Sequence, residues 1–465
     1  MAEYTPSIGL EAHVQLKTES KMFCGCDNDA DNKTPNSVIC PICMGMPGTL
    51  PVPNREAIEW TVKLGKFLGG KIARLSRFDR KHYYYPDLPK GYQISQYDWP
   101  MVKGGQISVN DRVIGLIRVH LEEDTGKLIH ARGDDCSLVD LNRAGTPLME
   151  VVTKPDIRTP SDAKAFLQRL RVIVRYLGIS DADMEKGHFR CDANVSIASN
   201  SKLETRNSKL GMPVEVKNLN SFLMVEKALA YEIGRQTEIL ARGDRVSKET
   251  RGWDDARSIT VSQRSKEQAP DYRYFPEPDI PTFNNLDKLS VVLPESIDDK
   301  IARARGLGMS SGDIDTIFSD SELIDTFDHI VGCAENNEVA NKALSLAINN
   351  KSVRLLDGAT TVDIAKELLA GKIGPQTVRS LARSILEKKI SVKEALARGN
   401  FGQISNPDTL RQTVKSVIKN NPQAVKDYRA GKHTAAGYLV GQIMKASSGK
   451  ANPQIVNQIL NEELK

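Results

Sequence analysis

Polar side chains suited to catalysis alternate with apolar ones along several short stretches of this sequence. The first stretch, SIGLEAHVQL, begins at Ser7 and places Glu11, His13 and Gln15 between apolar residues. Successive side chains of a β-strand point to opposite faces, so this pattern predicts a strand with one buried and one polar face. A single polar face is usually solvated, and only further strands of the same kind would indicate a binding site.

Four more stretches also carry polar side chains suited to catalysis. On one of them, Arg118, His120 and Glu122 alternate with apolar residues. Glu150 stands alone inside the apolar run PLMEVV, where an unpaired buried carboxylate would be costly. The two remaining stretches carry Arg190, Asp192, Asn194, Ser196, Glu215 and Lys217. A concave sheet lined by these groups would bind Mg²⁺ through carboxylates and phosphates through Arg and Lys, as phosphoryl transfer requires.

Four of the seven cysteines fall within twenty residues, as Cys24-Gly-Cys26 and Cys40-Pro-Ile-Cys43. Two close pairs on neighbouring turns can place four thiolates tetrahedrally around zinc, and four cysteines leave no open position, so the ion would be structural. The alternative is four unrelated buried thiols. An odd number of cysteines in a long chain argues against a disulfide framework.

The composition is typical of a globular protein, with 40% hydrophobic and 26% charged residues in a chain of 465. This length predicts two to four domains. No apolar run approaches the roughly 20 residues of a membrane helix, and the first residues lack the pattern of a secretory signal. We therefore expect a cytoplasmic protein without a membrane partner. The sequence also lacks a glycine-rich phosphate loop and a nucleophile elbow.

Strand patterns dominate the first part of the chain, and amphipathic helices dominate the rest. We predict an α+β fold with three domains. The first, over 1–294, has mostly antiparallel strands with interspersed helices and a zinc-binding insertion at 24–43. A helical domain over 295–402 and a helical tail over 403–465 follow. Among the interspersed helices, the one expected near 161–178 has Ser161 as its N-cap and Gly178 after its last turn.

The tail is basic. Residues 401–465 contain nine Lys and Arg, among them Lys432 and Lys465, against four Asp and Glu. This excess equals the net charge of +5 of the whole chain. It favours a polyanionic partner, although a solubilising surface would explain the charge equally well.

Long motifs make the chain resemble one family. GLEAHVQL, FDRKHYYYPDLPKGYQISQ, HLEEDTGK, DLNRAGTPLMEVVTKPD, RCDANVSI, EVKNLNSF and DYRYFPEPD follow in order, and GYLVGQIMKASSGKANPQIVNQIL lies in the tail. They resemble the B subunits of bacterial aspartyl/glutamyl-tRNA amidotransferases, and the resemblance covers nearly the whole chain. It implies a glutamine synthetase-like cradle, an all-α C-terminal region, and a heterotrimer with an amidase A subunit and a small C subunit.

The resemblance also implies a reaction. ATP and Mg²⁺ phosphorylate the side-chain carboxylate of misacylated Glu-tRNA(Gln) or Asp-tRNA(Asn), and ammonia from the A subunit then displaces phosphate. Matching motifs assign the metal-site and catalytic role to Glu11, His13, Glu150 and one of Glu122 or Glu123. Strand parity favours Glu122, but a β-bulge could reverse it, so both stay candidates. Weaker candidates for ATP contacts are Arg190, Asp192, Asn194, Lys217 and Asn218.

Two other functions stay open at this point. A small-molecule ATP-dependent carboxylate–amine ligase would act on free glutamate and leave the basic tail without a role. A zinc-containing RNA-binding scaffold would have no catalytic activity, and its polar strand faces would be merely solvated.

Overall fold

The computed structural model describes residues 4–110, 112–130, 136–199, 211–265, 272–399, 401–402, 404, 406–429, 434–447 and 450–464. The chain forms two compact units, Met1–Ser296 and Ile297–Lys465. The predicted tail begins at residue 403, which lies outside the described residues, as do Lys432 and Lys465.

The N-terminal unit contains the strands. They are β1 (Tyr4–Gln15), β2 (Lys71–Ile72), β3 (Leu75–Ser76), β4 (Asp79–His82), β5 (Tyr92–Ser95), β6 (Val102–Lys103), β7 (Gln106–Val109), β8 (Arg112–Glu123), β9 (Lys127–His130), β10 (Ser137–Asp140), β11 (Pro147–Thr153), β12 (Phe189–Ser199), β13 (Val214–Leu219), β14 (Glu249–Asp254), β15 (Ile259–Ser265), β16 (Phe275–Pro276) and β17 (Phe283–Asn284). Its helices are α1 (Arg55–Phe67), α2 (Pro160–Tyr176), α3 (Phe222–Ala241) and a short 3-10 turn (Leu286–Lys288).

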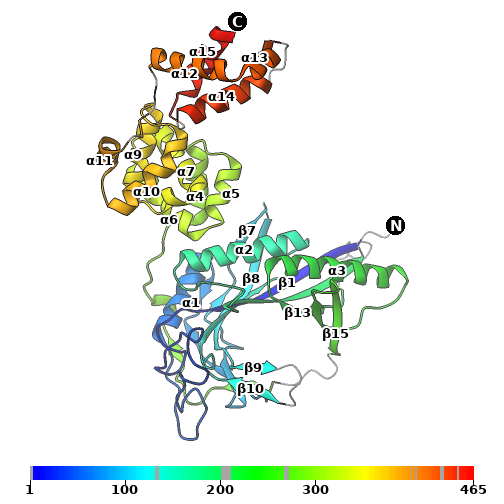
Figure 1. The fold of residues 1–465 in the computed structure, drawn as a ribbon. Coiled ribbons are helices and arrows are strands. Elements are labelled where there is room, and N and C mark those ends of the chain that lie inside the picture. Colours follow the sequence, from blue (N-terminus) through cyan, green and yellow to red (C-terminus); the bar gives the residue numbers. More distant parts are fainter. Residues whose placement is uncertain are drawn as a thin grey trace. The chain divides into compact units, whose positions relative to one another are not determined.

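One large sheet organises this unit. Among the described residues it has ten strands, in the order β15-β14-β13-β12-β1-β11-β8-β6-β2, with β7 also paired to β8. The β13–β14 pair is parallel and the other pairs are antiparallel. Helices α2 and α3 lie together on one side of the sheet, and the β9–β10 hairpin lies on the other (Figure 1).

The alternation of β1 is the one that the sequence predicted. Ile8, Leu10, Ala12 and Val14 are at most 1% exposed and belong to the core on the helix-covered side. The intervening side chains therefore point to the opposite face of the sheet, which is called here the open face.

Helix α2 begins earlier than predicted. Its N-cap is Thr159, whose hydroxyl accepts a hydrogen bond from the Asp162 amide, so the prediction of Ser161 is wrong. Pro160 explains the difference, because proline is favoured in the first position of a helix, where its missing N–H costs nothing. Gly178 follows the helix with a φ of 73°, as predicted.

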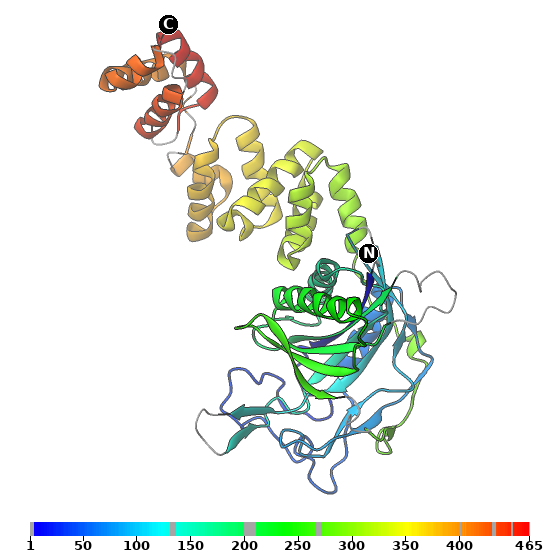
Figure 2. The same cartoon turned by 90° about the vertical axis from the view of Figure 1, so that its right-hand side faces the viewer.

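The C-terminal unit is helical throughout its described residues, apart from isolated bridges (Figure 2). Its helices are α4 (Ile297–Gly306), α5 (Ser311–Phe318), α6 (Ser321–Cys333), α7 (Asn337–Asn349), α8 (Lys351–Arg354), α9 (Gly358–Leu369), α10 (Val378–Lys388), α11 (Val392–Arg398), α12 (Pro407–Asn420), α13 (Pro422–Arg429), α14 (Thr434–Ala446) and α15 (Pro453–Leu464), with a 3-10 turn at Pro375–Thr377. The last four pack around their own buried apolar cluster, which runs from Leu410 to Leu464.

The architecture confirms the predicted fold class, which is α+β with a mostly antiparallel sheet followed by an all-helical region. None of the helices in the described residues is both long enough and apolar enough to cross a membrane.

Packing of α2 against its neighbours should contribute to the stability of the N-terminal unit. Leu167 on α2 is fully buried, whereas Leu223 on α3 is 51% exposed. We expect Leu167→Ala to lower the free energy of unfolding by about 2–5 kcal/mol, because it leaves a cavity. The matched Leu223→Ala change should stay within about 0.5 kcal/mol. Urea titrations followed by tryptophan fluorescence report on this unit, because Trp60, Trp99 and Trp253 all lie in it. Equal losses for the two variants would contradict the packing.

Candidate functional site

The open face carries a line of functional side chains across four neighbouring strands. On β1, His13 lies directly opposite Arg190 of β12 on one side and Glu150 of β11 on the other. Glu150 in turn lies opposite His120 of β8. Directly opposite residues in an antiparallel pair point to the same face, with Cβ atoms roughly 4.5–5.5 Å apart. The four groups therefore meet because of strand register.

Three of the predicted residues come together as a candidate cation site. The ligand atoms of His13, Glu122 and Glu150 lie within 4.8 Å of one another. His13 Nε2 is 3.6 Å from Glu150 Oε2 and 4.0 Å from Glu122 Oε1. Two carboxylates and one imidazole form a donor set that suits a divalent cation such as Mg²⁺ or Mn²⁺.

His120 completes this cluster, and sequence reasoning did not select it. Its Nε2 lies 3.2 Å from Glu150 Oε2 and 3.8 Å from Glu122 Oε2, and the residue is 2% exposed. The available signal was its place on the polar side of β8, between Arg118 and Glu122. Ser95 of β5 also supports the cluster, because its hydroxyl donates to Glu122 Oε2 at 2.9 Å.

The cluster keeps its buried carboxylates charged. Burial alone would raise the pKa of Glu150, but the charge and hydrogen bond of His120 and the hydrogen bond of His13 hold this pKa well below its usual value. Burial would also lower the pKa of His120, yet the charge of Glu150 and hydrogen bonds to both carboxylates raise it to about 9. A protonated His120 thus compensates the two anions.

Glu123 does not join the cluster. Its side chain forms an ion pair with Lys90, and Glu123 Oε1 accepts a hydrogen bond from the Ile94 amide at 2.9 Å. The pairing of β8 with β11 is regular from Glu123 to Arg118. No β-bulge therefore lies near Glu122, and its side chain points to the same face as that of His120. The geometry therefore selects Glu122 as the candidate ligand and gives Glu123 a different environment.

The remaining β1 candidate, Glu11, lies beside the cluster. It is directly opposite Asp192 on β12, and its Oε1 accepts a hydrogen bond from Asn194 Nδ2 at 3.0 Å. Burial, followed by the charges of Glu150 and Asp192, raises the pKa of Glu11 above its usual value. The structure therefore places Glu11 next to the three ligand candidates without including it among them.

The cations expected to bind phosphate already have acidic partners. Arg190 Nη2 donates to Asp124 Oδ2 at 2.7 Å, and Lys217 forms ion pairs with Asp192 and Glu215. Asn218 is exposed at a register irregularity between β12 and β13, with a φ of 65°. Among the described residues it makes no hydrogen bond to the cluster. The arrangement brings Arg190, Asp192, Asn194 and Lys217 to the open face and leaves Asn218 at its margin.

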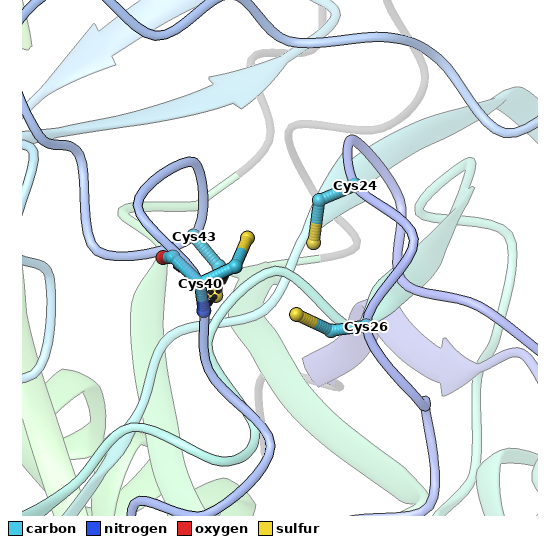
Figure 3. Close-up of side chains that lie close together, drawn as sticks. All are labelled: Cys24, Cys26, Cys40 and Cys43. Atoms are coloured by element: carbon cyan, nitrogen blue, oxygen red, sulfur yellow. Dashed lines mark hydrogen bonds between the residues drawn. The ribbon is translucent and has the colours of Figure 1, made fainter.

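The four predicted cysteines converge from two loops. Cys24 and Cys26 lie on one turn and Cys40 and Cys43 on another, with all four sulfurs directed toward a common point (Figure 3). The sulfurs lie within 4.8 Å of one another, and those of Cys40 and Cys43 are 3.9 Å apart. Tetrahedral zinc with Zn–S bonds of about 2.3 Å separates its sulfurs by roughly 3.8 Å. The residues therefore fit a structural zinc site.

The surroundings of the four thiols favour the thiolate form of Cys43. A hydrogen bond from Cys24 and the charge of Lys21, outweighing burial, lower the pKa of Cys43 to about 5. Lys21 is 1% exposed, with Nζ 3.9 Å from Cys43 Sγ and 2.9 Å from the Val38 carbonyl. A buried cation next to a thiolate cluster offsets part of its negative charge.

An open face with a carboxylate–imidazole cluster, joined to an all-helical region, defines an α+β protein with a candidate site for cations and phosphates. Comparison with known families is more specific. The model of the GatB/GatE catalytic domain matches residues 6–289, and the model of the GatB domain matches residues 336–464. The chain belongs to the family of amidotransferase B subunits, which confirms the resemblance and the prediction of a ligase-type amidotransferase subunit.

Full-length relatives agree with this assignment. Several proteins that are named as B subunits of aspartyl/glutamyl-tRNA(Asn/Gln) amidotransferases are similar to this chain from end to end. The one from Thermotoga maritima is 42% identical over 99% of both chains. The one from Carboxydothermus hydrogenoformans is 43% identical over 100% of this chain and 99% of its own. The one from Moorella thermoacetica is also 43% identical, over 99% of this chain and its whole length.

The two adjacent glutamates should differ in their effect on cation binding. We expect Glu122→Gln to weaken Mn²⁺ binding to the chain by about 10–100-fold, because it removes a charged oxygen donor. Glu123→Gln should leave Mn²⁺ affinity within about threefold and lower thermal stability instead, because Lys90 loses its partner. Electron paramagnetic resonance titration with Mn²⁺ measures both affinities. The reverse ranking would mean that Glu123 is the ligand.

Zinc content tests the cysteine cluster. We expect the purified chain to carry one zinc ion and Cys40→Ser to lose most of it, because three thiolates hold zinc more weakly than four. Cys333→Ser, which changes an exposed cysteine of the helical unit, is the matched control. Elemental analysis gives the stoichiometry, and an unchanged zinc content in Cys40→Ser would exclude this ligand set.

Proposed function

We propose that this chain is the tRNA-binding, ATP-using subunit of an amidotransferase that converts Glu-tRNA(Gln), Asp-tRNA(Asn) or both to the amidated forms. The observation that carries the proposal is the grouping of His13, Glu122 and Glu150 on the open face of the sheet. The full-length similarity to proteins named for this substrate pair supports the choice of substrate.

The proposed reaction has two steps. An oxygen of the substrate carboxylate attacks the γ-phosphorus of ATP, the bond to the ADP oxygen breaks, and an acyl phosphate forms. Ammonia then attacks the acyl carbon, phosphate leaves, and nitrogen loses a proton to give the amide. Ammonia would come from glutamine through an amidase A subunit, with a small C subunit completing the heterotrimer.

Different residues of the open face would bind the cation, compensate its carboxylate ligands and position the substrate. His13, Glu122 and Glu150 would hold Mg²⁺, which, when bound, neutralises the charge that develops on the phosphoryl oxygens. His120 keeps the carboxylates ionised before the cation binds, since its own pKa is raised to about 9 by Glu150 and the hydrogen bonds that outweigh burial. Glu11 and Asn194 would position a substrate group at the next place along β1.

The other parts of the chain would serve the RNA and the fold. The cysteine cluster would hold a structural zinc, and the Lys and Arg of helices α12, α13 and α14 would bind the tRNA backbone. This division corresponds to a cradle over 1–294, a helical domain over 295–402 and a tail over 403–465.

An assay of the reconstituted heterotrimer tests the proposal. We expect His13→Ala to lower tRNA-dependent ATP hydrolysis by at least about 100-fold, because loss of cation binding removes several kcal/mol of transition-state stabilisation. Gln15→Ala on the same face of β1 is the matched control and should keep its activity. Glu-tRNA(Gln), Asp-tRNA(Asn) and free glutamate are supplied separately.

Each outcome of this assay selects one function. Turnover of free glutamate would support a small-molecule ligase. Full tRNA-dependent hydrolysis in His13→Ala would show that the metal-site assignment is wrong. Binding of tRNA without any ATP hydrolysis in the unaltered complex would favour the scaffold function.

A further inference from the structure

Three cations lie side by side at one edge of the open face. Arg118 of β8 is directly opposite Lys103 of β6, and Lys103 is directly opposite Lys71 of β2. Strands in a sheet lie roughly 4.8 Å apart, so the row extends about 10 Å from Arg118 to Lys71. Residues 71, 103 and 118 are called the cationic row below.

The cationic row points to the same face as the carboxylate cluster. The neighbouring residues Ile72, Val102 and Val119 are all buried, on the side where α1 packs against β2, β6 and β8. Alternation therefore turns the cationic row the other way. Arg118 also precedes His120 by two residues on β8, which places its side chain next to the cluster on that face.

The charges of the cationic row are uncompensated within the described residues. No described carboxylate lies within 4.0 Å of these three side chains, and Arg118 Nε is buried without a hydrogen-bond partner. Arg190 and Lys217 differ, because each is paired with a carboxylate. Like charges directly opposite one another in a sheet repel, so this row favours an anion that bridges its members.

We propose that the cationic row binds consecutive phosphates of the RNA strand that delivers the aminoacyl group to the cluster. This inference rests on the proposed function and adds a substrate path to it. The row begins beside the cluster at β8 and leads outward through β6 to β2, the last strand of the sheet. Lys103 on β6 and Lys71 on β2 are both exposed. The phosphates of a nucleotide that reacts at the cluster would need cations at the cluster itself. The backbone phosphates of an RNA strand extend further, so they match a row of cations that leads away from the cluster.

The chemistry of the side chains agrees with this path. Lysine ammonium groups on flexible stems contact phosphates as point charges, without demanding one geometry. Such contacts position a nucleic acid without reading its sequence. The cationic row would therefore guide any acceptor end into the site and leave discrimination between tRNAs to other surfaces.

Salt dependence of RNA binding tests the row without requiring catalysis. The full-length chain is titrated with unacylated tRNA(Gln), followed by fluorescence anisotropy, at several KCl concentrations. We expect Lys71→Met, Lys103→Met and Arg118→Met each to lower the slope of log affinity against log salt by about 0.7–0.9, because each removes one phosphate contact. Arg118→Lys should restore the slope, since the positive charge is kept.

Lys227→Met is the matched control, because Lys227 is an exposed lysine of α3 on the helix-covered side. It should leave the slope unchanged. An unchanged slope in all three row variants would overturn the proposal. A rise in the KM for ATP, measured separately in the reconstituted heterotrimer, without a change in slope would also overturn it, because the row would then bind the nucleotide. Failure of the proposed function is seen separately, as tRNA-independent activity or as full hydrolysis in His13→Ala.

Discussion

The open face depends on the register in which β1 pairs with β11 and β12. This register places His13 between Glu150 and Arg190, and the next strand adds His120 beside Glu150. A slip of one residue would turn the polar set of β1 toward the helices and bring Ala12 to the open face. The burial of Ile8, Leu10, Ala12 and Val14 prevents such a slip. The same apolar residues that form the core therefore align the site.

The cations on this face are of two kinds: those paired with a carboxylate and those without such a partner among the described residues. Some cations are matched to carboxylates, as Arg190 is to Asp124 and Lys217 to Asp192. Such pairs are already satisfied, and an incoming phosphate would have to compete with a carboxylate for them. The cationic row has no such competition within the described residues. An anionic substrate should therefore bind most favourably at the cationic row, where no described carboxylate competes with it.

The fold class and parts of the candidate site could be predicted from the sequence. Strand periodicity predicted the fold class and the polar face of β1, and spacing predicted that the four cysteines meet. His120 was harder to select, because its importance comes from Glu150, thirty residues later in the chain. The N-cap of α2 is Thr159 and not Ser161, because Pro160 occupies the first helical position.

The cationic row could not have been predicted in this way. β2 and β6 have only two residues each, so they show no periodicity. Lys71 and Lys103 become neighbours of Arg118 only once the order of strands is known. Likewise, strand parity favoured Glu122 over Glu123, but only the regular pairing with β11 removes the possibility of a local bulge.

The central place of β1 also affects how the chain can fold during synthesis. It precedes the other described strands in the sequence, yet both of its partners, β11 and β12, lie more than a hundred residues further on. An apolar strand without partners is prone to pair wrongly, and contacts between distant segments form slowly. β1 cannot be paired on both sides until β12 has left the ribosome, so it keeps an unpaired edge, which favours aggregation, throughout that interval. β1 can therefore complete its pairing on both sides only after more than 170 further residues have been made, as far as Phe189 at the start of β12.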